Sequence, residues 1–266
     1  MKQIRDLNRR DFLKWSALGF SAAALGQLQI GFAQGEAREL IVVSNAGNPD
    51  EGIDATVSLI DPRTLGVLQT LPLAGAFSFP ANRWHFGRDV IWSGLPAGPN
   101  NAVLGFRLST GELEVEVGTG STQNYTELTP DGRYLIVAAR FEDRYLKLAA
   151  DPEAADFGEV VAEFATYEGA EPCDLTIDAD GRYAYAPDRG GDTVTVIEIE
   201  SFERVATLPL ERFGAAPLEP YMATMSPRGD YLYVENAPVE GGPDAGSESI
   251  IDVRDPRAPV EVMRFT

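Results

Sequence analysis

The feature that most constrains the fold is a turn that returns at a nearly constant spacing along the chain. Gly132, Gly181 and Gly229 are 49 and 48 residues apart, and each is followed two residues later by a tyrosine that opens a strand-like segment. A repeat of this length is typical of propeller blades, because one four-stranded sheet buries both of its faces only by stacking on copies of itself. The spacing therefore predicts an all-β propeller.

The stretch 171–210 contains one complete unit of this repeat. Its sequence, EPCDLTIDADGRYAYAPDRGGDTVTVIEIESFERVATLPL, predicts strands at 174–178, 183–186, 193–198 and 204–210, with a tight turn at Asp180-Gly181. Four short strands in about forty residues make one antiparallel blade.

About five such units fill the chain after its leader, near 38–73, 80–118, 122–165, 171–210 and 219–266. The first unit lacks a segment that matches the innermost strand of the others. The expectation is either a five-bladed ring with an imperfect seam or a shortened, open form of a seven-bladed ring. An open blade edge would expose unpaired backbone groups and favour self-association.

The N-terminal residues indicate export. The run Asn8-Arg9-Arg10-Asp11-Phe12-Leu13-Lys14 resembles a twin-arginine signal, and the apolar stretch 15–25 that follows is too short to span a bilayer. We expect residues 1–33 to be a signal peptide cleaved after Ala33, and residues 34–266 to form the propeller domain. The resemblance implies a periplasmic or secreted protein that is exported folded, with no membrane span after the signal is removed.

The charge balance limits the possible partners. The chain carries 41 acidic and 22 basic residues, with a formal net charge of −19. Such a surface repels nucleic acid and suits a cationic protein or small molecule, although an acidic surface also serves solubility alone.

Three turn-and-strand segments carry a family resemblance. TPDGRYLIVAA, DADGRYAYAPDRGGDTVTVIEIE and SPRGDYLYVEN resemble the repeat of the YVTN-type β-propellers, which are WD40-like in architecture, and the likeness extends over about 38–266. The superfamily includes lactonase-like hydrolases and the propeller subunit of quinoprotein amine dehydrogenases. None of their catalytic residues has a motif here that would allow it to be carried over, so the resemblance implies a fold rather than an activity.

Few residues are available for catalysis or metal binding. His85 is the one histidine and Cys173 the one cysteine, so a histidine-rich metal site, a Ser-His-Asp triad with a spare base and an internal disulfide are not expected. No phosphate-binding loop, dinucleotide fingerprint or haem attachment motif is present. We therefore predict no catalytic residues, no metal and no cofactor.

Candidate ligand-binding residues are those that enter the innermost strands, because propellers bind ligands most often where these entries gather at the channel mouth. Glu-Pro occurs at 171–172 and again at 219–220. This recurrence indicates either two carboxylates that converge on a cation or, as we favour, a shared turn geometry. His85 is interpreted as a packed strand residue, and the less favoured alternative is a lone general base. The predicted set is Arg83, His85, Asn124, Tyr125, Glu171, Glu219 and Tyr221.

Taken together, these features favour an exported propeller that acts as a non-catalytic module for binding a ligand or protein. The alternative is an enzyme-associated role, either as the propeller subunit of a periplasmic quinoprotein-type oxidoreductase or as a lactonase-like hydrolase. Whether the protein is an enzyme stays open at this point, with the scarcity of catalytic residues weighing against it.

Overall fold

The structure is a computed structural model that describes residues 41–48, 51–73, 82–85, 88–94, 101–214, 218–237 and 246–265. The chain divides into two units, Met1–Glu36 and Ala37–Thr266, and every described residue belongs to the second. The expected twin-arginine leader therefore lies outside the described residues. The part of the chain that is described contains no helix long and apolar enough to cross a membrane.

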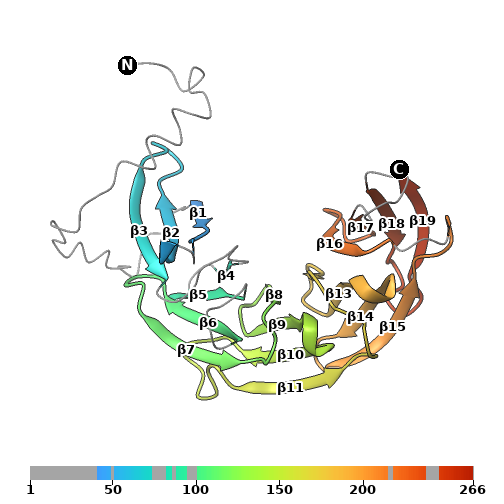
Figure 1. The fold of residues 1–266 in the computed structure, drawn as a ribbon, viewed down its shortest axis with the longest axis horizontal. Coiled ribbons are helices and arrows are strands. Elements are labelled where there is room, and N and C mark those ends of the chain that lie inside the picture. The colour runs from blue at the N-terminus through green and yellow to red at the C-terminus, as the bar shows by residue number, and fades with distance from the viewer. Residues whose placement is uncertain are drawn as a thin grey trace. The chain divides into compact units, whose positions relative to one another are not determined.

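The described residues form five antiparallel sheets that follow one another in chain order (Figure 1). The first sheet contains β1 (Ile41–Asn45), β2 (Ala55–Ile60) and β3 (Val67–Leu73). The second contains β4 (Asn82–Trp84), β5 (Val90–Ser93), β6 (Ala102–Arg107) and β7 (Leu113–Gly118). The third contains β8 (Asn124–Leu128), β9 (Tyr134–Ala139), β10 (Arg144–Ala149) and β11 (Val160–Ala165).

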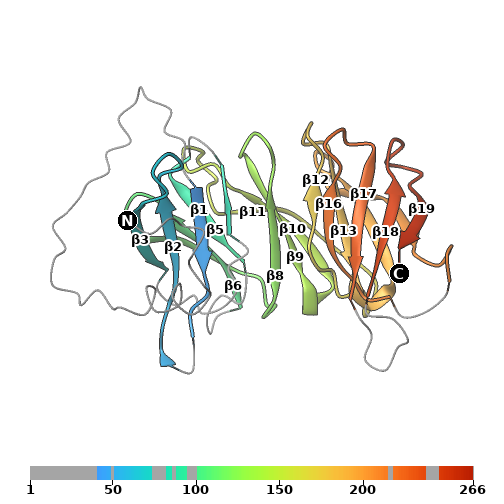
Figure 2. The ribbon, with the colours of Figure 1, turned by 90° about the horizontal axis from the view of Figure 1, so that it is seen from above.

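The last two sheets repeat this order. The fourth contains β12 (Thr176–Ile177), β13 (Tyr183–Asp188), β14 (Thr193–Glu198) and β15 (Glu203–Pro209). The fifth contains β16 (Pro220–Met225), β17 (Tyr231–Asn236), β18 (Ser247–Asp252) and β19 (Val260–Phe265), whose strands lie side by side in Figure 2. The predicted all-β fold of about five stacked, mostly four-stranded blades is confirmed. β12 is shorter than the predicted strand at 174–178, because its pairing with β13 covers only two residues.

The first sheet has three described strands, and a repeated hydrogen-bond pattern identifies which ones. Asn45 at the end of β1 donates to the hydroxyls of Thr56 and Ser58, both at 3.0 Å. Asn236 at the end of β17 donates in the same way to Ser247 and Ser249, also at 3.0 Å. β1 therefore corresponds to the second strand of a complete sheet, and within the described residues the innermost strand is lacking, as the sequence predicts.

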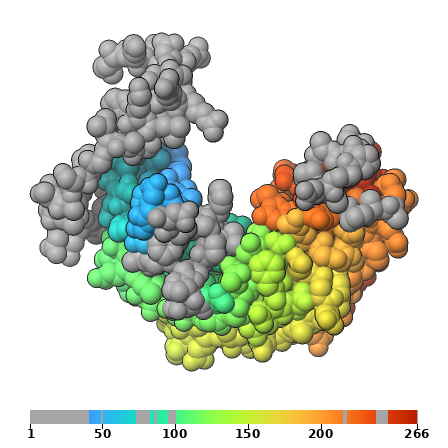
Figure 3. Space-filling view, viewed as in Figure 1, coloured from blue at the N-terminus to red at the C-terminus, as the bar shows by residue number. Residues whose placement is uncertain are grey.

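The core is built between neighbouring sheets, each of which presents alternate residues to opposite sides. On β9, for example, Leu135 and Val137 pack toward the second sheet while Ile136 and Ala138 pack toward the fourth. Two further clusters join the first sheet to the second and the fourth to the fifth. Figure 3 shows the sheets in continuous contact along the chain. The packing explains why the middle strands are continuously apolar instead of alternating.

The turn glycines have the conformation that the repeat predicts. Gly132, Gly181 and Gly229 have φ angles of +69°, +69° and +74°, a region that side chains with a Cβ atom disfavour. At each turn the glycine N–H donates to the carbonyl three residues earlier, at distances of 2.8 to 3.0 Å.

Candidate functional site

One cluster of charged side chains joins the innermost strands of successive sheets. Arg83 on β4 donates from Nε to Oε2 of Glu127 on β8 at 2.8 Å. Its Nη2 lies 3.8 Å from Oδ1 of Asp174, just before β12. Oδ2 of Asp174 in turn accepts the N–H of Ala223 on β16 at 3.3 Å. We call Arg83, Glu127 and Asp174 the inner-strand site, since their contacts connect the second to the fifth sheet.

Glu127 and Asp174 have a higher pKa than ordinary carboxylates. Burial raises the pKa of Glu127 above its usual range, despite the lowering effect of Arg83, and the charge of Asp174 adds to the rise. Burial likewise raises the pKa of Asp174, with a contribution from Glu235. The Glu127 and Arg83 side chains are nevertheless 28% and 29% exposed, so solvent reaches them. A raised carboxylate pKa beside a reachable guanidinium is an arrangement suited to acid–base chemistry.

Glu171 and Glu219 are held in ion pairs that repeat from sheet to sheet. Arg140, in the single-turn helix η3 (Arg140–Glu142), donates to Oε2 of Glu171 from Nε at 3.1 Å and from Nη2 at 2.6 Å. Arg189, in η4 (Arg189–Gly191), pairs with Glu219 in the same way, with Nε at 3.0 Å. Each arginine therefore clamps its own sheet to the next.

The backbone of these two glutamates completes the clamp. Glu171 and Glu219 both have a φ of +46°, and their N–H groups donate to Asp143 and Asp192 at 2.8 and 2.9 Å. The recurrence of Glu-Pro in the sequence thus reflects a shared turn geometry, the interpretation that we favoured. Their carboxylates point to arginines of the protein, which leaves them poorly suited to bind a cationic ligand.

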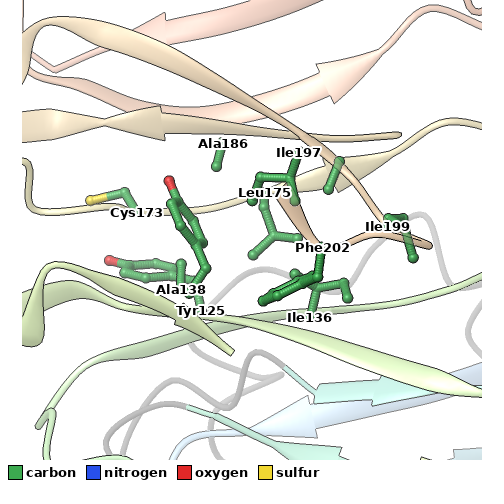
Figure 4. Close-up of a cluster of buried hydrophobic side chains, with 11 residues drawn as sticks. Tyr125, Ile136, Ala138, Cys173, Leu175, Ala186, Ile197, Ile199 and Phe202 are labelled. Atoms are coloured by element: carbon green, nitrogen blue, oxygen red, sulfur yellow. The ribbon is translucent and has the colours of Figure 1, made fainter. Parts of the chain in front are cut away.

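Tyr125 and Tyr221 meet although they are far apart in the chain. Their hydroxyls are 2.9 Å apart and their rings pack edge to face, 6.0 Å between centroids. Arg189 lies over the Tyr221 ring at 5.5 Å. Cys173 is fully buried beside Tyr125 (Figure 4), and burial raises the pKa of its thiol to about 11. The thiol is therefore a packing group rather than a nucleophile.

The hydrogen bonds of His85 and Asn124 go to groups other than the inner-strand carboxylates. The ring of His85 packs against the β8–β9 turn, with Nε2 2.9 Å from the carbonyl oxygen of Pro130. Asn124 is fully buried and donates to the carbonyl of Ser121 at 3.0 Å. Of the seven predicted residues, the structure brings Arg83 to the inner-strand site, and it places Tyr125, Glu171, Glu219 and Tyr221 around the sheet-to-sheet clamps.

Glu127 and Asp174 were not among the predicted residues. The prediction took the residues that open each innermost strand, whereas these carboxylates lie further along. A signal was present at Glu127, a charged residue inside the short β8 strand NYTEL. Asp174 gave a weaker one, because its burial depends on the neighbouring sheets and cannot be seen in the local sequence.

A separate cavity of about 520 Å³ lies between the turns of the third and fourth sheets, lined in part by Arg133, Tyr134 and Arg182. Beneath it, the buried Lys147 donates to the carbonyls of Ile199 and Glu200 at 2.8 and 3.1 Å. Because the ammonium group is already bonded to the backbone of the next sheet, we interpret this lysine as structural. In the described part of the chain, no group of three or more His, Cys, Asp or Glu side chains is placed to hold a metal ion.

A family model described as lactonase, 7-bladed beta-propeller, matches residues 118–236. This is less than half of the 266 residues, and it contains Glu127, Asp174 and Glu235. No curated protein matches the chain.

Solved structures are similar over most of the chain. A candidate 6-phosphogluconolactonase from Bacteroides uniformis has 19% identity and a TM-score of 0.68, with 85% of this chain and 68% of that chain covered. One from Bacteroides fragilis has 20% identity and a TM-score of 0.65, with 86% and 68% covered. A protein from Lactobacillus plantarum has 15% identity and a TM-score of 0.65, with 87% and 69% covered. At these identities the likeness shows the β-propeller fold.

Proposed function

We propose that the protein is a lactonase-like hydrolase that opens a cyclic ester at the inner-strand site. The observation that carries this proposal is Arg83 beside two carboxylates of raised pKa, Glu127 and Asp174, on the innermost strands. The lactonase family model supports it, because its match contains both carboxylates. The sequence alone favoured a non-catalytic module, because it contains no constellation of histidine, cysteine or nucleophile with a base; Glu127 beside Arg83 is a candidate acid–base group of another kind.

The chemistry assigns one role to each residue. Arg83 places positive charge where the lactone carbonyl oxygen becomes negative. Glu127, ionised, takes a proton from a water molecule as its oxygen bonds to the carbonyl carbon. The ring C–O bond then breaks, and the departing oxygen receives the proton from Glu127 to give a hydroxy acid. Asp174 positions Arg83 and sustains the raised pKa of Glu127.

The test is hydrolysis of a panel of neutral γ- and δ-lactones by the full chain and by Glu127→Gln. Loss of a general base costs about 10²–10⁴-fold in rate, so the variant is expected to lose activity by that factor. His85→Ala is the control, since this ring contacts a turn and not the site. Equal activity of the wild type and Glu127→Gln, or no turnover of any lactone, contradicts the proposal.

A second candidate is binding of a cationic ligand without turnover. It is favoured by the excess of carboxylates, since Glu127 and Asp174 face one guanidinium. Calorimetric titration with a primary amine would show heat that disappears in Asp174→Asn. Binding of amines together with inertness toward lactones would select this function.

The remaining expectations stay predictions. Export through the twin-arginine route and a periplasmic or secreted location depend on residues outside those described. The role of a propeller subunit in a quinoprotein-type oxidoreductase rests on the family resemblance alone.

A further inference from the structure

The fifth sheet leaves one face uncovered by any described residue. Tyr233, Ile250 and Met263 form a row across β17, β18 and β19. Met222 and Phe265 lie in the next row of the same face, with Glu235 and Glu248 between them. Met222, Met263 and Phe265 are 45%, 46% and 54% exposed. We call the apolar residues Met222, Tyr233, Ile250, Met263 and Phe265 the last-sheet face. Apolar side chains gathered in this way mark a surface that binds another protein surface.

The same row is buried one sheet earlier. Tyr185, Val196 and Ala206 occupy the fourth sheet in the same register, as paired residues of β13, β14 and β15. Tyr185 and Val196 are 2% and 0% exposed because they pack on the fifth sheet. In this row the last-sheet face therefore repeats the side of a sheet that receives a following sheet, while the next row has Glu235 and Glu248 where the fourth sheet has Pro187 and Val194.

The first sheet carries the other half of such an interface. Asn45 and Asn236 make matching hydrogen bonds, so Ile41 and Val43 of β1 correspond to Leu232 and Val234 of β17. In the fifth sheet these positions are 0% exposed against the fourth sheet, whereas Ile41 and Val43 are 40% and 36% exposed. We call Ile41, Val43, Ile60 and Val67, which share one side by register, the first-sheet face.

We propose that a second copy of this chain occupies these surfaces, with the last-sheet face of one copy packed on the first-sheet face of the next. A second copy fits because the chain has both surfaces of a sheet-to-sheet interface, the first-sheet face and the last-sheet face. The same kind of interface already joins its fourth and fifth sheets. The contact is head to tail. An assembly of any length therefore exposes a first-sheet face at one end and a last-sheet face at the other. Because every copy is acidic, with a net charge of −19, salt that screens repulsion strengthens the association.

The test uses two variants of the full chain, each with a charge in one face. Met263→Lys alters the last-sheet face and Val43→Lys alters the first-sheet face, while Val161→Lys is the control. Val161 lies on β11 of the third sheet and is 40% exposed, so it matches the other two in exposure. Circular dichroism and thermal unfolding check that each variant folds, and sedimentation velocity over a range of protein concentrations measures its mass.

Wild type and Val161→Lys are expected to grow in mass with concentration and with salt. Met263→Lys and Val43→Lys each lose this behaviour alone. Mixed together they form a one-to-one dimer, because each variant retains the face that the other needs. A wild type that stays monomeric at every concentration overturns the proposal. So does self-association of Val43→Lys alone, which would indicate that last-sheet faces pair with each other.

Discussion

Asp188 is a fully buried carboxylate held by hydroxyl groups. It accepts hydrogen bonds from Tyr145 at 2.8 Å, Thr193 at 2.8 Å and Thr195 at 2.6 Å. Burial raises its pKa to about 6, above the ordinary 3.8, although the three hydroxyls act in the opposite direction. In the first and fifth sheets the equivalent position is asparagine, which makes the corresponding bonds without a charge.

The raised pKa of Asp188 predicts how the free energy of unfolding depends on pH. The folded state binds the Asp188 proton more tightly than the unfolded state, so this residue's contribution is greatest below pH 4 and falls as pH rises toward 6. A shift of two pKa units corresponds to about 3 kcal/mol. Asp188→Asn should remove this slope and unfold at equal or higher urea concentration at pH 7.5. Urea titrations at pH 4.5, 5.5 and 7.5 measure the slope, and identical slopes in both proteins would contradict the assignment.

At the level of single residues, the sequence predicts local geometry better than it predicts the site. The turn glycines could be recognised because a positive φ angle leaves a residue-type signature. Glu127 and Asp174 leave weaker signals, because their raised pKa values arise from burial by strands of other sheets. Glu171 and Glu219 were conspicuous in the sequence as a repeat, yet the repetition comes from a clamp between sheets.

The β8–β9 turn is an element whose tightness can be tested. A Cβ atom built on Gly132 would lie 2.6 Å from Cγ of His85, whereas one on Gly229 meets nothing within 4 Å. Both glycines have positive φ, so Gly132→Ala and Gly229→Ala share that conformational cost. Overpacking adds about 1–3 kcal/mol to Gly132→Ala alone. Chemical denaturation measures the difference, which should shrink in a His85→Ala background, where only the Cβ atom of residue 85 remains, 3.0 Å from the added Cβ; equal costs in the presence of His85 would contradict this packing.

The arginine clamp is the corresponding link between sheets. The Arg140 side chain is 11% exposed and bonds both Gln123 of its own sheet and Glu171 of the next. Arg140→Ala should lower the free energy of unfolding by about 1–3 kcal/mol, since charge-assisted hydrogen bonds in a buried setting are lost. Arg254→Ala, which removes an exposed pair with Asp252, is the control and should change little. Comparable losses in the two variants would show that the clamp is no stronger than a surface pair.

For the whole molecule, the repeat period is sufficient to predict the sheets, because each blade must meet a neighbour of the same kind. The three-stranded first sheet is also predictable, since its sequence aligns with the second, third and fourth strands of a complete blade. The inner-strand site, in contrast to the sheets, cannot be predicted from the repeat. It joins residues from the second to the fifth sheet, and nothing in a local segment indicates which side chains the stacking brings together.

The central claim is that ionised Glu127 acts as the base in lactone opening, and the pH dependence of kcat/KM tests it most directly. Activity should fall as pH drops through a pKa above the ordinary 4.5 of a glutamate, because burial and Asp174 raise that of Glu127. Asp174→Asn removes one of these causes, so its acidic limb should move to lower pH. An acidic limb at or below 4.5, or one that Asp174→Asn leaves unmoved, would contradict the account.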